Sequence, residues 1–240
     1  MCRLIVATGD VPVPRIVRAA VAMSTGRTAD HDGPITRHPN GWGAVWADPG
    51  SPTGLRSHRD VRPMADSWHE APFAGLRTPV LAIHVRHATL PHNLGEPFTH
   101  PLHRPDGPVP WYFMHNGFLP TVYRHLGLAA SRFDSAEYFD YLVPAGATEL
   151  VESEALARLR AIAPGGSSGN AIAMTPTRSY VVHWTAAGNA YPRYFGMHRL
   201  RRPGLDVVSS EVIPSLAARH RWQPLPPNVV LDLHGRNRES

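Results

Sequence analysis

The single cysteine of this 240-residue chain stands at position 2, directly after Met1. Removal of Met1 would place a thiol and a free α-amine on one residue. A thiolate is a strong nucleophile, and an α-amine titrates near neutral pH, so the amine can serve as the base for the thiol. The sequence therefore predicts an N-terminal nucleophile at Cys2. The alternative is a small apolar side chain that packs at the start of a strand.

Two apolar runs end in polar residues that could surround this thiol. The run 79–89 is apolar at first and then carries His84, Arg86, His87 and Thr89. The aromatic run 111–114 is followed by His115, Asn116 and Gly117. An apolar strand that turns polar in this way is typical of a strand that leaves the core at a site. Arginine suits a carboxylate, because its planar guanidinium can donate two parallel hydrogen bonds.

A helix is expected to begin at Asp134. Asp134 would be its N-cap, and Glu137 follows three residues later, which is the spacing of a capping box. Apolar residues then recur at helical spacing through Val143.

The other elements follow from periodicity and from turn residues. Strands are expected at 2–8, 40–46, 53–60, 169–175, 179–184, 206–209 and 228–233. Helices are expected at 12–24, 63–69, 118–126 and 148–163, and loops at 25–39 and 91–110. Strands, then helices, then strands favour an α+β fold in which helices cover a largely antiparallel sheet system.

Composition points to one globular domain over residues 1–240. Hydrophobic residues make up 42% and charged residues 18%. The apolar runs are too short to span a bilayer and no signal peptide is visible, so a cytoplasmic protein is expected, with no membrane partner. A single cysteine excludes an intramolecular disulfide. The net charge of +5 is attributed to solvated loop and tail residues at 198–202 and 236–238, and nucleic acid is not expected as a partner.

Several short motifs, in this order, resemble the class II glutamine amidotransferase family of N-terminal nucleophile hydrolases. They are Met1-Cys2-Arg3, Gly41-Trp42-Gly43, His84-Val85-Arg86-His87-Ala88-Thr89, His115-Asn116-Gly117 and Asp134-Ser135, with a weaker match at Ser209-Ser210-Glu211. The likeness is greatest to stand-alone members similar to the ergothioneine-pathway γ-glutamyl amidohydrolase. It implies a four-layer αββα sandwich, in which two antiparallel sheets pack together and helices flank them.

The resemblance also implies roles for individual residues. Cys2 would be the nucleophile, and Asn116 and Gly117 would form the oxyanion hole. Arg86 would bind the substrate α-carboxylate with support from Thr89, and Asp134 would bind the α-ammonium. His87 and Trp42 would lie beside the substrate. The implied substrate is glutamine or a γ-glutamyl compound, cleaved through a γ-glutamyl thioester without a cofactor or metal.

Three positions depart from the family pattern. Phe98 precedes Thr99-His100-Pro101 where the family has an asparagine, and Leu90 replaces a polar residue. The segment 134–137 is one residue longer than the usual Asp-Ser-Glu. These departures favour an altered or larger γ-glutamyl compound over free glutamine.

Other functions remain open from the sequence. The chain could be a glutaminase subunit that supplies ammonia to a separate synthetase, or a binding module without turnover. A metal-dependent hydrolase would use the histidines at 84, 87, 92, 100, 103 and 115. At single positions, Arg86 could form a buried ion pair, Asn116-Gly117 could be a turn, and Asp134 could serve only as a helix cap.

Overall fold

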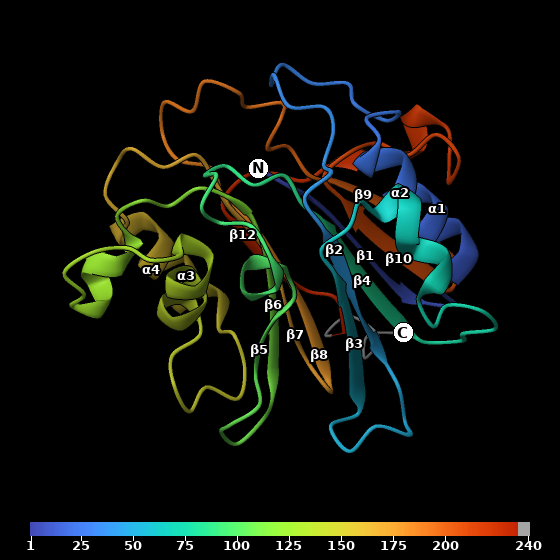
Figure 1. Ribbon diagram of the computed structural model, residues 1–240, viewed down its shortest axis with the longest axis horizontal. Helices are drawn as coiled ribbons and strands as arrows, with labels where there is room; N and C mark the ends of the chain where they lie inside the picture. Colours follow the sequence, from blue (N-terminus) through green and yellow to red (C-terminus); the bar gives the residue numbers. More distant parts are fainter. Residues whose placement is uncertain (235–240) are drawn as a thin grey trace.

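Strand β1 (Arg3–Gly9) lies inside the larger of two antiparallel sheets, which pack face to face (Figure 1). The computed structural model describes residues 1–234. Within them the larger sheet has the order β11 (Gln223–Pro224), β9 (His198–Arg202), β10 (Leu205–Ser209), β1, β4 (Val80–Val85), β2 (Trp42–Ala47) and β3 (Leu55–Asp60). The smaller sheet has the order β12 (Val229–Asp232), β8 (Arg178–His183), β7 (Gly169–Thr175), β6 (Trp111–Gly117) and β5 (Leu102–Arg104).

Helices cover the outer face of each sheet. Helices α1 (Val13–Ser24) and α2 (Met64–Ser67) lie on the larger sheet, and α3 (Asp134–Leu142) and α4 (Glu152–Ala161) lie on the smaller one (Figure 1). Short 3₁₀ turns occur at Trp68–Glu70, Glu96–Phe98, Val122–Leu126 and Arg219–Arg221. The layers are therefore helix, sheet, sheet and helix, which confirms the expected α+β, four-layer αββα architecture.

The side chains of β1 show how the layers are held together. Ile5 and Ala7 pack against the α1 layer, whereas Leu4 and Val6 pack between the two sheets. Successive side chains of a strand point to opposite faces, and here both faces are buried. This explains why the segment is a continuous apolar run rather than an alternating one.

Strand register brings three chain segments together at one end of the sandwich. Arg3 at the start of β1 lies opposite Val85 at the end of β4. The chain leaves β4 toward Arg86 at this point. The end of β6, with Asn116, approaches from the other sheet, where Asn116 pairs with Asn170 of β7. Cys2 therefore lies where the polar ends of the two predicted strands meet.

The structure corrects several expected strand boundaries. The run 79–89 is a strand only to Val85, so Arg86, His87 and Thr89 lie beyond the strand. The expected loop 91–110 contains β5, which pairs with β6. Residues 198–202, expected to be a charged loop, form β9, because Arg199 is buried and pairs with Asp206 of β10. The basic segment 236–238 lies outside the described residues.

The helices differ from expectation at their ends. The segment 118–126 forms only a 3₁₀ turn, and the fourth helix is shorter than 148–163. Asp134 is not the N-cap of α3, because Phe133 occupies that position. The Glu137 carboxylate instead accepts hydrogen bonds from the backbone N–H groups of Arg132 and Phe133 at 2.6 and 3.2 Å. Because Asp134 does not cap the helix, its carboxylate can interact with another group.

No helix among residues 1–234 has the length and apolar character needed to cross a membrane.

Candidate active site

Cys2 is held at the start of β1 by contacts on both sides. Its backbone N–H donates to Asn116 Oδ1 at 2.8 Å, and its side chain is almost completely buried. The Met1 ammonium before it donates to the carbonyl oxygen of His87 at 2.7 Å and to Thr89 Oγ1 at 2.9 Å. The N-terminus is thus bound to the segment that follows β4 and to the end of β6.

The surroundings of the Cys2 thiol favour the thiolate. Burial opposes ionisation, but His84, the N-terminal ammonium and Arg86 outweigh it and hold the pKa of Cys2 well below its usual range. Burial also lowers the pKa of the Met1 ammonium. A thiol with these neighbours is a stronger nucleophile at neutral pH than an ordinary cysteine, because a larger share of it is ionised.

Asn116, which accepts from the backbone N–H of Cys2, also carries an unused hydrogen-bond donor. Its side chain is buried, and its Nδ2 has no hydrogen-bond partner within residues 1–234. A buried amide N–H₂ without a partner is uncommon, because burial removes its water ligands. The group can donate to a negative oxygen that forms beside Cys2 during a reaction. Asn116-Gly117 is the end of β6 and not a turn.

A small cavity of about 30 Å³ lies at Cys2. Its lining includes most of the predicted site residues, namely Cys2, Arg86, His87, Thr89, Gly117 and Asp134. It is about the size of one water molecule. Met1 also lines this cavity, so removal of Met1 would enlarge it directly in front of the thiol.

Arg86 and Asp134 place opposite charges on the walls of this cavity. Arg86 donates to the carbonyl oxygens of Asn40 and Asn93, which uses two of its five N–H groups. No carboxylate within residues 1–234 forms an ion pair with Arg86. The alternative of a buried ion pair is therefore wrong for the described residues. One Asp134 oxygen accepts from the Leu119 N–H at 2.9 Å. One fixed cation and one fixed anion suit a zwitterionic amino-acid head group.

Trp42 is the predicted site residue that the structure places elsewhere. It is fully buried in the core beneath α1 and α2, and its indole Nε1 donates to Ser67 Oγ at 2.9 Å. It does not line the cavity at Cys2. The structure therefore gives Trp42 a packing role, in place of the expected contact with substrate.

Other cavity residues were not predicted as site residues. They are Leu90, Asn93, His100, His115, Phe118, Phe133 and Ser135. The His100 ring lies 4.3 Å from the His84 ring, and burial keeps the pKa of His100 well below its usual range. The motif Thr99-His100-Pro101 was the available signal for His100. Asn93 and Phe133 carry no comparable sequence signal.

The buried histidines near Cys2 contact groups of the protein itself. Within residues 1–234, no group of three or more His, Cys, Asp or Glu side chains is arranged to hold a metal ion. The ring of His84 lies 3.1 Å from the carbonyl oxygen of His115, and His115 Nδ1 lies 2.9 Å from Ser135 Oγ. These rings therefore link the two sheets and α3.

A second cavity, of about 780 Å³, lies at the opposite end of β1. It is lined by Thr8, Gly9 and several arginines of β9. Thr8 is six residues from Cys2, which corresponds to about 20 Å along a strand. This cavity is separate from the cavity at Cys2.

Comparisons with known proteins agree on the fold. No family model matches the sequence, and neither does a curated protein. Glutamine phosphoribosylpyrophosphate amidotransferase from B. subtilis matches with a TM-score of 0.68 at 15% identity, over 98% of this chain and 47% of that chain. The allosteric regulatory enzyme of purine biosynthesis also matches with a TM-score of 0.68, at 17% identity and with the same coverage.

A glutamine aminotransferase class-II domain protein from Silicibacter pomeroyi matches with a TM-score of 0.58 at 19% identity, over 98% of this chain and 95% of that chain. The chain thus spans about half the length of the first two proteins and nearly all of the S. pomeroyi protein. At these identities the likeness establishes the fold, which is that of class II glutamine amidotransferase domains.

Proposed function

We propose that this protein is an N-terminal cysteine amidohydrolase of the class II glutamine amidotransferase type. It would cleave the side-chain amide of glutamine or of a γ-glutamyl compound. The observation that carries the proposal is the pairing of Cys2 with Asn116. The amide oxygen of Asn116 holds the Cys2 backbone, while its amide nitrogen is buried and without a partner among the described residues. The same fold in known amidotransferase domains supports it.

Substrate binding would use the opposite charges of the cavity. Arg86 binds the α-carboxylate through its remaining N–H groups, and Thr89 supports the same end. Asp134 binds the α-ammonium through the oxygen that does not accept from Leu119. Both groups lie on the cavity that contains Cys2, so the side-chain amide of the bound substrate extends toward the thiol.

The chemistry proceeds in two steps once Met1 has been removed. The Cys2 thiolate attacks the amide carbon, and the oxyanion accepts hydrogen bonds from Asn116 Nδ2 and the Gly117 N–H. The Cys2 α-ammonium donates a proton to the departing nitrogen, which leaves as ammonia or an amine. The α-amine then takes a proton from water as the water attacks the γ-glutamyl thioester. This step releases glutamate and regenerates the Cys2 thiolate.

Two forms of this function differ in the fate of the released ammonia or amine. In the leading form, a stand-alone amidohydrolase, the ammonia or amine is released to solution. In the second form, a glutaminase unit, ammonia passes to a separate synthetase. The departures at Leu90 and Phe98 favour a γ-glutamyl compound with a larger leaving group. The unpaired thiol suits a reducing compartment such as the cytoplasm.

The test is glutamate release from glutamine and from a series of γ-glutamyl amides. The wild-type protein is expected to release glutamate from at least one of them, and Cys2→Ala is expected to abolish the reaction. Undiminished turnover by Cys2→Ala would rule out the proposal. For the two forms, a weak activity that rises on addition of a synthetase identifies the glutaminase unit.

A further inference from the structure

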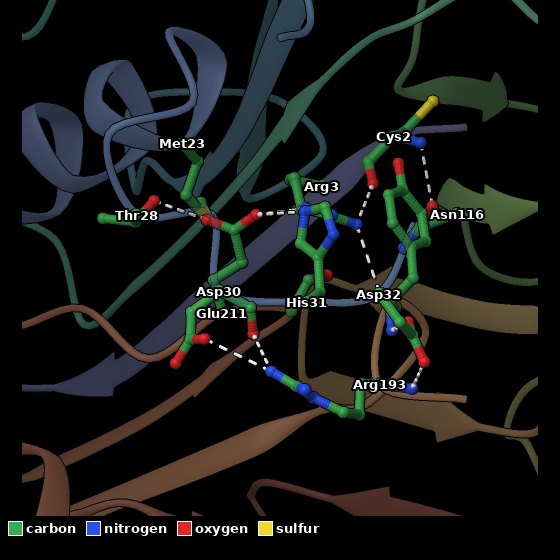
Figure 2. Close-up of polar contacts among 12 residues, drawn as sticks. Cys2, Arg3, Met23, Thr28, Asp30, His31, Asp32, Asn116, Arg193 and Glu211 are labelled. Carbon is green, nitrogen blue, oxygen red and sulfur yellow. Dashed lines mark hydrogen bonds and ion pairs between the residues drawn. The ribbon is translucent and has the colours of Figure 1, made fainter. Parts of the chain in front are cut away.

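Arg3, the residue after the nucleophile, is completely buried beside Cys2. Its Nη1 donates to the carbonyl oxygen of Cys2 at 3.2 Å and to the carbonyl oxygen of Tyr194 at 3.3 Å. Its guanidinium carbon lies 3.7 Å from the centre of the Tyr194 ring. Figure 2 shows that the Cys2 carbonyl faces Arg3, whereas the thiol points away from it. Arg3 therefore fixes the backbone of the nucleophile without contacting its sulfur.

Glu211 holds Arg3 in this position. Its Oε1 accepts from Arg3 Nε at 2.5 Å, and the Glu211 side chain is 3% exposed. The segment that carries Glu211 is bound directly to β1. The Ser210 N–H donates to the Leu4 carbonyl oxygen at 2.9 Å, and the Leu4 N–H donates to Ser210 Oγ at 3.0 Å. The weak motif Ser209-Ser210-Glu211 thus lies next to the N-terminal residues.

Both carboxylate oxygens of Glu211 contact the loop between α1 and β2. Thr28 Oγ1 donates to Glu211 Oε2, and the His31 ring lies 3.7 Å from Oε1 (Figure 2). The other end of the same loop contacts the substrate side of the site. Asn40 accepts from the Ala88 N–H through its Oδ1 at 3.0 Å and binds the backbone of Arg86. One loop therefore connects the proposed substrate-binding residue Arg86 with the residues that hold Cys2.

We infer that Glu211, Arg3 and Thr28 form a positioning relay, in which the loop 25–39 sets the orientation of the Cys2 backbone through the Glu211–Arg3 pair. None of the three residues is placed in contact with the reacting atoms. Correct placement of a nucleophile is worth large factors in rate, and a shift of about 1 Å can cost about 100-fold. The inference rests on the proposed role of Cys2 as nucleophile.

Two matched sets of variants test the relay. Glu211→Gln keeps the shape of the side chain and removes the charge that Arg3 binds. Asp206→Asn removes a comparable carboxylate, which pairs with Arg199 on the far part of the same sheet. At the loop, Thr28→Val removes the hydroxyl donor, and Thr28→Ser retains it.

The first measurement is the rate of Cys2 alkylation by iodoacetamide, which requires no amidase activity. Glu211→Gln is expected to react at least about tenfold more slowly and Thr28→Val about threefold more slowly, whereas Thr28→Ser and Asp206→Asn react at the wild-type rate. The second measurement is turnover of the best γ-glutamyl amide. There kcat is expected to fall by similar factors, with KM within about threefold.

Three outcomes would overturn the relay. They are wild-type alkylation rates in both Glu211→Gln and Thr28→Val, an equal loss in Asp206→Asn, and a failure of Thr28→Ser to restore the rate. Loss of one partner of a buried pair can prevent folding. Thermal unfolding is therefore measured first, and the Thr28 pair decides the outcome if Glu211→Gln does not fold. If wild-type protein releases no glutamate, the amidase proposal fails, while the alkylation rates still test the relay.

Discussion

The backbone N–H of Cys2 donates to Oδ1 of Asn116 at 2.8 Å. A backbone N–H can only donate, so this contact fixes which end of the Asn116 amide faces Cys2. The donor end, Nδ2, is therefore not used by the Cys2 backbone, and it is buried without a partner in residues 1–234. One side chain thus both orients the nucleophilic residue and offers a hydrogen bond to an oxyanion. After removal of Met1, the same oxygen could accept from the new α-amine.

Asn116→Asp should strongly reduce turnover. The variant keeps an oxygen that can accept from the Cys2 N–H, but it replaces the Nδ2 donor with an acceptor. Loss of one oxyanion donor is worth about 100- to 1,000-fold in kcat. Steady-state kinetics on the best γ-glutamyl substrate measures this, with thermal unfolding as the control. A kcat within threefold of wild type would remove Asn116 from the oxyanion hole.

Asp134→Asn should weaken substrate binding. The amide oxygen of the new side chain can still accept from the Leu119 N–H, so the fold is preserved, but the negative charge on the cavity wall is lost. A hydrogen bond between charged groups contributes about 1.5–3 kcal/mol, so KM should rise about 10- to 100-fold with a smaller change in kcat. Asp140→Asn in the same helix, whose carboxylate is mostly exposed, is the matched control. Equal KM values for the two variants would contradict the role of Asp134.

The Cys2 thiol should react as a thiolate already at neutral pH. Its pKa lies well below the usual range despite burial, because His84, the N-terminal ammonium and Arg86 favour the charged form. The rate of alkylation by iodoacetamide should therefore stay nearly constant between about pH 7 and 9, where an ordinary cysteine, with a pKa near 8.5, becomes about 25-fold more reactive. His84→Gln should restore a rise with pH. A wild-type rate that follows the ordinary cysteine profile would contradict this explanation.

Buried histidines should make the fold sensitive to acid. Burial, followed by the charges of Arg3 and the N-terminus, lowers the pKa of His38 to about 2, so this ring is neutral in the folded protein. The unfolded chain takes up a proton near pH 6.5, and stability therefore falls as the pH decreases below that value. His38 should contribute about 1.4 kcal/mol of this loss per pH unit.

Urea unfolding at pH 6.5 and pH 5.5 measures this contribution. His38→Gln should lose about 1 kcal/mol less than wild type over that interval, because glutamine does not titrate and the unfolded His38 is already half protonated at pH 6.5. Equal losses in the two proteins would show that His38 is already protonated in the fold, or is not buried as the structure has it.

The apolar runs predicted an α+β fold, and the αββα layering could be predicted because the ordered motifs resemble a family that has it. Residues 2–8 were recognisable as a strand because both of its faces are buried. Strand β9 was not recognisable as a strand, since the sequence His198-Arg199-Leu200-Arg201-Arg202 is typical of a charged surface segment. Its pairing depends on Asp206 of β10, a contact that no local pattern encodes.

Site residues could be predicted where they belong to a recognisable motif. Cys2, Arg86, Thr89, Gly117 and Asp134 meet at one cavity, as their motifs indicated. Trp42 belonged to an equally clear motif but faces the helix layer, because the motif does not indicate which face of the sheet the side chain occupies. The structural consequence of Ser209-Ser210-Glu211 depends on a contact across 208 residues between Glu211 and Arg3, which sequence spacing does not reveal.

The most direct test of Cys2 as an N-terminal nucleophile is the intact mass of the protein before and after treatment with 6-diazo-5-oxo-norleucine, a reactive glutamine analogue. We expect a mass that lacks Met1 and gains one adduct, localised to Cys2 by peptide mapping. We also expect excess γ-glutamyl substrate to slow the labelling. A protein that retains Met1, or one that gains no adduct at Cys2, would contradict an N-terminal cysteine acting on a glutamyl group.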